Sequence, residues 1–92
     1  MKQNGVTSDG KVVIGGVYDF HATHGTPFEE LFDLLESFGM VVDWKEATLS
    51  AKAHGTRLDT FIGKVHTGVV DTWGLEAWAA ISAAINDYYT AG

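Results

Sequence analysis

Three stretches of this chain each begin with a residue type that caps helices and end in glycine: 26–39, 43–55 and 56–68. A Thr or Asp side chain at the start of a helix accepts a hydrogen bond from an amide of the first turn, and an acidic residue three positions later reaches back to the cap. Glycine adopts the left-handed conformation that ends the helix. The repeated pattern therefore predicts three short helices joined by tight turns.

The apolar residues in these stretches recur at helical spacing. The first predicted helix, 27–38, has an apolar stripe opposite four acidic residues, and the third, 57–67, has another clean stripe. The second, 44–54, is rich in alanine, which allows close approach of a neighbouring helix. A fourth helix is expected over about 75–89, where apolar residues cover nearly every direction, a composition typical of a buried helix.

The N-terminal part of the chain shows little helical character. Residues 1–10 are polar and include two glycines, so we expect a flexible lead followed by a single helical domain over 11–92. Residues 11–20 form the only β-like stretch, either a hairpin turning at Gly15-Gly16 or one bent edge segment. The predicted fold class is mainly α, a small bundle of four helices with a short β-like N-terminal segment.

Charge and cysteine content narrow the possible functions. Twelve acidic and six basic residues give a net charge of −6, which disfavours non-specific binding to nucleic acid or anionic membranes. The chain has no cysteine, which excludes disulfides and thiolate sites and favours a cytoplasmic location. No apolar run approaches the length of a membrane span. We therefore expect a soluble cytoplasmic protein, located in the host cytoplasm or the virion if the source is viral.

Catalytic and metal-binding patterns are weak. Residues 19–24 bring together one aspartate and two histidines, but zinc needs a further ligand, so we interpret the segment as a polar loop leading into a helix. There is no nucleophile elbow and no phosphate-binding glycine loop. The paired carboxylates lie on an outer helix face, where nothing would remove their water. We expect neither an enzyme nor a cofactor or metal site.

The fourth predicted helix has more apolar surface than a chain of 92 residues is expected to cover. Trp and Tyr are typical anchors of interfaces, and an acidic helix face suits a basic partner. We therefore expect a protein partner, or self-association through this helix. The candidate interface residues are Trp73, Trp78, Ile81, Ile85, Tyr88 and Tyr89, together with Glu30, Asp33 and Glu36.

The corresponding function is contact without chemistry, as an adaptor, an inhibitor or an assembly component. Short, acidic, cysteine-free chains are frequent among accessory proteins of bacteriophages and mobile elements. On this general similarity we expect a source of that kind.

The alternative function is a small DNA-binding regulator that uses residues 44–67 as a helix-turn-helix. Ala51 precedes Gly55 by four residues and Phe61 falls where a recognition helix packs inward. Residues 43–66 carry four basic and three acidic residues, a sum of +1. The candidates to contact DNA are Arg57, Thr60 and Lys64, and DNA is a partner only in this alternative.

Overall fold

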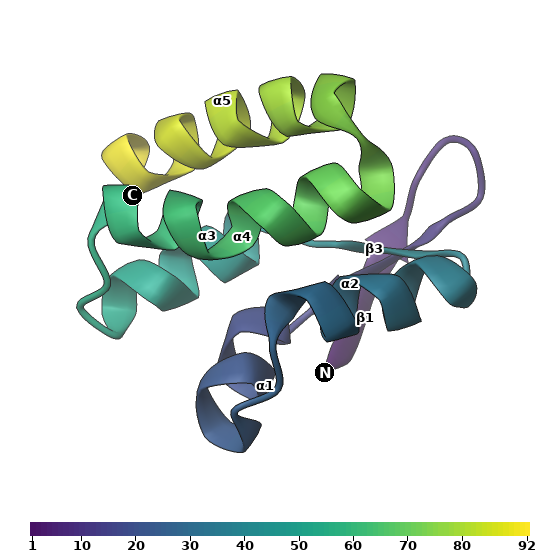
Figure 1. The fold of residues 1–92 in the computed structure, drawn as a ribbon, viewed down its shortest axis with the longest axis horizontal. Helices are drawn as coiled ribbons and strands as arrows, with labels where there is room; N and C mark the ends of the chain where they lie inside the picture. The colour runs from purple at the N-terminus through teal and green to yellow at the C-terminus, as the bar shows by residue number, and fades with distance from the viewer.

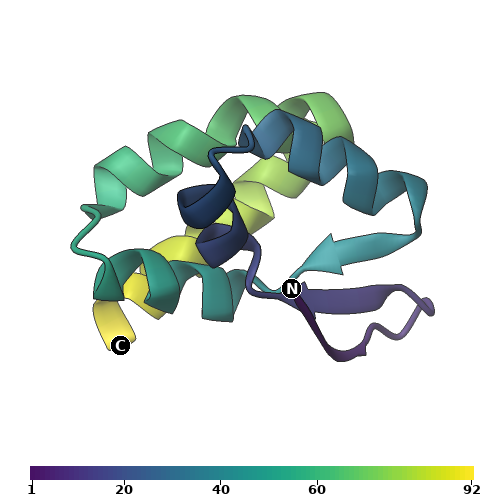
Figure 2. The ribbon, with the colours of Figure 1, turned by 90° about the horizontal axis from the view of Figure 1, so that it is seen from below.

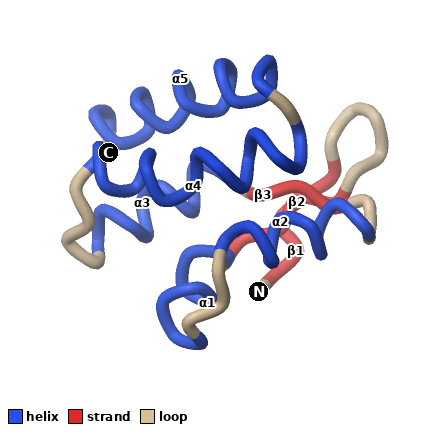
Figure 3. Tube along the Cα trace, viewed as in Figure 1, coloured by secondary structure: helices blue, strands red, loops and turns tan.

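The computed structural model describes residues 1–92 and consists of five helices and a three-stranded sheet (Figures 1 and 3). The strands are β1 (Lys2–Val6), β2 (Val12–Gly15) and β3 (Met40–Val42). The helices are α1 (Val17–His24), α2 (Phe28–Ser37), α3 (Trp44–Ala53), α4 (Leu58–Trp73) and α5 (Leu75–Ala91). The mainly helical class is thus confirmed. The number of helices is five rather than four.

The additional helix, α1, begins directly after the two glycines that were expected to form a turn or lie in an edge segment. Gly16 has φ of 81°, in the left-handed region, and redirects the chain from β2 into α1. Val17 and Tyr18 are buried, and Gly25, with φ of 69°, ends the helix. The stretch 19–24 is therefore helical and not the polar loop expected from the sequence.

The sheet has the order β1-β2-β3, with β1 antiparallel and β3 parallel to the central strand β2. Residues 1–10, expected to be a flexible lead, instead contain β1 and the turn into β2. All five β1 residues are exposed. Four of them are polar or glycine, so the sequence lacks the alternation of apolar and polar residues that predicts a strand. The sheet lies at one end of the molecule and the C-terminus lies at the opposite end (Figure 2).

The predicted capping pattern is correct for one helix only. The Asp43 side chain accepts a hydrogen bond from the Glu46 amide at 3.1 Å and begins α3, as the sequence indicates. Helices α2 and α4 begin after Pro27 and Arg57 without a side-chain cap, so Thr26 and Thr56 do not perform that role.

Helix α4 continues through Gly68 to Trp73, five residues beyond its predicted glycine stop. Gly68 is buried where α4 crosses α2. A Cβ atom there would lie 2.7 Å from Cδ2 of Phe32, closer than carbon atoms can approach without a shift. Close helix packing therefore explains this glycine, and a helix end does not.

The core lies between the sheet, α2 and the three C-terminal helices. Its fully buried side chains include Phe32 of α2, Phe61 and Val65 of α4, and Ile85 of α5. Trp44 and Trp73 pack around Phe32, with ring centroids 5.6 and 5.3 Å from it. None of the helices combines the length and the apolar composition needed to cross a lipid bilayer.

Candidate protein-binding surface

Most large apolar side chains of α5 are covered by the rest of the chain. Ile85, a predicted interface residue, is fully buried within the chain and has no surface to offer a partner. Trp78 and Ile81 pack partly buried against the same core. The exposed residues of α5 include Ala79, Ala80 and Ala83. Trp78, Ile81 and Ile85 share one face of α5, and this helix packs on α3 and α4, whereas Leu75 at its start is 70% exposed.

The remaining predicted aromatic anchors are half-buried, and three of them have partners within the chain. The Trp73 indole N–H donates to a Glu36 carboxylate oxygen at 2.8 Å, and the Tyr89 hydroxyl donates to the Thr56 carbonyl at 2.9 Å. The Trp78 and His66 rings meet edge to face, with centroids 4.9 Å apart. These contacts hold α4 and α5 against the rest of the fold. Tyr88 borders a small hollow at the C-terminus.

Trp73 and Ile81, both predicted interface residues, also line an apolar hollow of about 340 Å³ between β3 and α5. The remaining lining residues are Val41, Val42, Trp44 and Ala77. Glu36 lies beside this hollow through its hydrogen bond to Trp73.

The outer side of α2 combines acidic and large apolar side chains. Glu30 and Asp33 are exposed, as expected from the sequence. Leu34 is 49% exposed and Phe38, directly after the helix, is 67% exposed. Phe38 has the spacing of the apolar stripe predicted over 27–38, but α2 ends before it and its ring stays exposed. We refer to the exposed side chains of Glu30, Asp33, Leu34 and Phe38 as the α2 surface.

A hollow of about 480 Å³ separates the α2 surface from α1. Its lining residues are Phe20, Thr26, Glu30, Leu31, Asp33, Leu34 and Ser37. We call it the α1–α2 hollow. Two carboxylates and no basic side chain line it. Leu34 was missed from the sequence, although it follows Glu30 by four residues and therefore shares its helix face.

Charge is concentrated on α2. This helix carries Glu29, Glu30, Asp33 and Glu36 and no basic residue. The Lys11 amine lies 4.0 Å from Glu36, at the edge of ion-pair distance, and both side chains are substantially exposed. Such an exposed pair contributes little, so α2 remains strongly acidic toward solvent.

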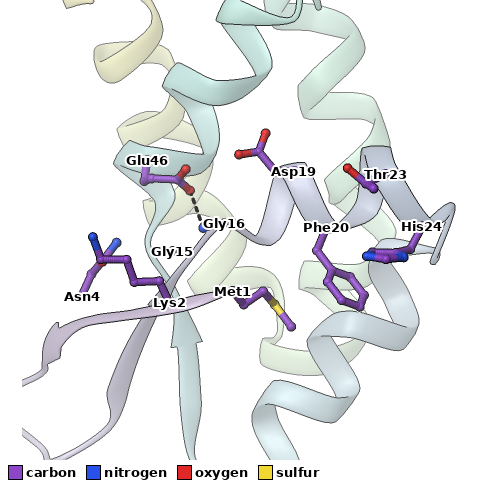
Figure 4. A pocket seen from close by; sticks show the side chains of 10 residues that line it. All are labelled: Met1, Lys2, Asn4, Gly15, Gly16, Asp19, Phe20, Thr23, His24 and Glu46. Carbon is purple, nitrogen blue, oxygen red and sulfur yellow. Dashed lines mark hydrogen bonds between the residues drawn. The ribbon is translucent and has the colours of Figure 1, made fainter.

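Another hollow of about 480 Å³ also has Phe20 in its lining, and most of its lining residues are polar (Figure 4). Asp19, His24 and Glu46 line it. The remaining part of the lining includes Lys2, the first residue of β1, and Met1 directly before it. The Glu46 carboxylate accepts a hydrogen bond from the Gly16 amide at 2.8 Å and so holds the start of α1. Part of this polar lining thus maintains the fold.

Asp19 is the centre of a small polar cluster. Its Oδ1 accepts a hydrogen bond from the Ser50 hydroxyl at 2.6 Å and lies 3.0 Å from Nε2 of His54. The Ser50 hydrogen bond, with a smaller contribution from His54, lowers the pKa of Asp19 below its ordinary value of 3.8. The carboxylate lies between the hydroxyl and the imidazole, whereas nucleophilic catalysis places the imidazole between the other two groups. The cluster therefore joins α1 to α3 and does not activate the serine.

The histidines of α1 do not converge on a metal site. The His21 ring stacks on Phe28 at 3.9 Å, and its Nδ1 lies 2.7 Å from the Thr26 carbonyl oxygen. His24 packs against Phe20 instead. No group of three or more His, Cys, Asp or Glu side chains is arranged to hold a metal ion.

The residues proposed to contact DNA lie on an exposed side of the α3–α4 unit. Thr60 and Lys64 are exposed, and Arg57 forms an ion pair with Asp59 at 2.9 Å. Ala51 and Phe61 are buried and Gly55 has φ of 80°, as a helix-turn-helix requires. Asp71 is also exposed on α4, so the two basic residues are balanced by two acidic ones. The net positive charge around these residues is therefore small.

No protein-family model, no curated protein and no solved structure matches the chain.

Proposed function

We propose that this protein acts by binding another protein, without catalysis, and that the α2 surface makes the contact. One observation carries the proposal. Two large apolar side chains stay exposed four residues apart: Leu34 on α2, whose other outward residues are mostly acidic, and Phe38 directly after the helix. A single exposed leucine is ordinary, but neighbouring large apolar residues beside a hollow are typical of an interaction site.

Burial of these side chains by a partner would supply binding free energy. A leucine or phenylalanine side chain contributes about 1.5–3 kcal/mol when it passes from full exposure to full burial, and Leu34 and Phe38, which are already partly covered, would each contribute less. The surrounding carboxylates favour partners of opposite charge and increase the rate of encounter. An adaptor, an inhibitor or an assembly component acting in the cytoplasm fits this mode of action.

Self-association through α5 has less support than contact through α2. The exposed residues of α5 include three alanines, which offer little area, although Leu75 at its start is 70% exposed. DNA binding through Arg57, Thr60 and Lys64 has less support as well, because Arg57 is paired with Asp59 and so little positive charge attracts phosphates only weakly.

The test is an affinity pull-down from lysate of the source organism, with and without nuclease. The bait is the wild type, the double variant Leu34→Ser with Phe38→Ser, or the control Leu75→Ser. We expect a stoichiometric protein that survives nuclease, is retained by the control and is lost with the double variant. Loss with Leu75→Ser alone would move the contact to α5. Recovery of DNA would instead support the helix-turn-helix alternative.

A further inference from the structure

We propose that the partner segment is a basic amphipathic helix that lies in the α1–α2 hollow. This inference rests on the proposed contact through α2 and specifies the chemistry of what is bound there. Its apolar side chains would pack against Leu34 and the floor of the hollow, and its lysine or arginine residues would face Glu30 and Asp33.

The shape of α2 favours a helical partner. Glu30 and Leu34 are four residues apart and so form a ridge along α2, and Phe38 follows at the same spacing directly after the helix ends. The hollow runs beside this ridge, with Leu31 of α2 and Phe20 of α1 at its apolar lining. An amphipathic helix binds by laying its apolar face into a groove, and the hollow between α1 and α2 provides one.

The charged residues that line the hollow determine which charge the partner segment should carry. Glu30 and Asp33 both line it, and none of its lining residues is basic. A second copy of this chain has a net charge of −6 and would be repelled. A basic segment would be attracted, and this attraction would weaken as salt screens the exposed carboxylates.

A model peptide allows a direct test on the full chain. The probe is a peptide of about 15 residues with leucine at helical spacing and lysine elsewhere. Two control peptides are used: one has glutamate in place of lysine, and the other has the same composition in scrambled order. Binding is followed by NMR chemical shifts of isotope-labelled protein, at low and at high salt.

We expect shift changes that concentrate on α1 and α2, and an affinity that falls with salt. The Glu30→Lys, Asp33→Lys double variant should bind the lysine peptide at least about tenfold more weakly. The matched control Asp71→Lys with Glu76→Lys reverses the same number of exposed charges on α4 and α5 and should change the affinity by less than about threefold. Leu34→Ser should also weaken binding, and circular dichroism checks that each variant is folded.

Equal weakening by the two charge-reversal pairs would overturn the proposal, because binding would then follow only the net charge. Equal binding of the scrambled peptide would overturn the helical shape of the partner. If the glutamate peptide bound best and Leu34→Ser weakened it, the α2 contact would stand and the basic partner would be wrong. If no peptide shifted α2 and the pull-down showed no dependence on Leu34 and Phe38, the proposed function would fail as well.

Discussion

Thr48 is the one buried side chain of α3 whose polar atom lacks a hydrogen-bond partner. The residue is fully buried and its hydroxyl contacts no acceptor or donor. A buried hydroxyl without a partner costs free energy that an apolar group of similar shape does not. We expect Thr48→Val to raise the free energy of unfolding by about 1 kcal/mol in urea denaturation. Thr60→Val on the exposed side of α4 should change it much less. A destabilised Thr48→Val protein would show that the hydroxyl does have a partner.

Asp19 should make the stability of the folded protein depend on pH. Its pKa is lowered in the folded state, chiefly by the Ser50 hydroxyl, so its contribution is present at pH values above the ordinary value of 3.8. That contribution is lost as the pH falls through the lowered pKa. We expect the difference in melting temperature between wild type and Asp19→Asn to be largest near neutral pH and to shrink below pH 3.8. For Asp71→Asn, an exposed residue without a hydrogen bond, we expect a small difference throughout. A pH-independent difference for Asp19→Asn would contradict this account.

At the level of elements, two glycines of α4 should respond oppositely to alanine. Gly63 has open space around it, so Gly63→Ala should stabilise the protein by about 0.5–1 kcal/mol through helix propensity. Gly68 lies against the buried ring of Phe32, so Gly68→Ala should destabilise it by about 1–3 kcal/mol. Thermal unfolding of both variants, measured with wild type, provides the comparison. If Gly68→Ala stabilised the protein as Gly63→Ala does, α2 and α4 would be packed less closely at Gly68 than the structure shows.

The elements that the sequence predicts are those with local signals. Asp43 and Gly55 bound α3 because a cap and a left-handed glycine act within a few residues. Helix α1 was missed because it is short, has no side-chain cap and buries only two residues. Gly68 looks like a helix stop in the sequence, but it is required by tertiary packing that no local pattern contains.

The candidate surface was predictable in part for the same reason. Exposure of Glu30 and Asp33 follows from helix periodicity, whereas exposure of Phe38 depends on where the chain turns into β3. For α5, the positions of the large side chains alone would have indicated the buried face. Trp78, Ile81 and Ile85 are spaced by three and four, which places them on one face, with alanines opposite.

At the level of the whole molecule, residues 1–10 contribute no buried side chain. The core is built from later residues, beginning at Ile14. We therefore expect a variant that lacks residues 1–10 to keep its helical circular dichroism and to melt cooperatively at a lower temperature. The loss comes from the β1–β2 pairing and from the hydrogen bond between Asn4 and Asp43. A variant without a cooperative transition would show that β1 is essential to the domain.

The parallel pairing of β2 and β3 has a consequence for the order of folding. The antiparallel β1–β2 hairpin closes over a short turn, but β3 reaches β2 only after the intervening chain forms α1 and α2 and reverses direction. Closing the longer loop between β2 and β3 loses more chain entropy than closing the hairpin, and this loss comes before the strand contacts form. The last pairing to form should therefore be that of β3, and its amides should exchange with solvent as one unit with α2.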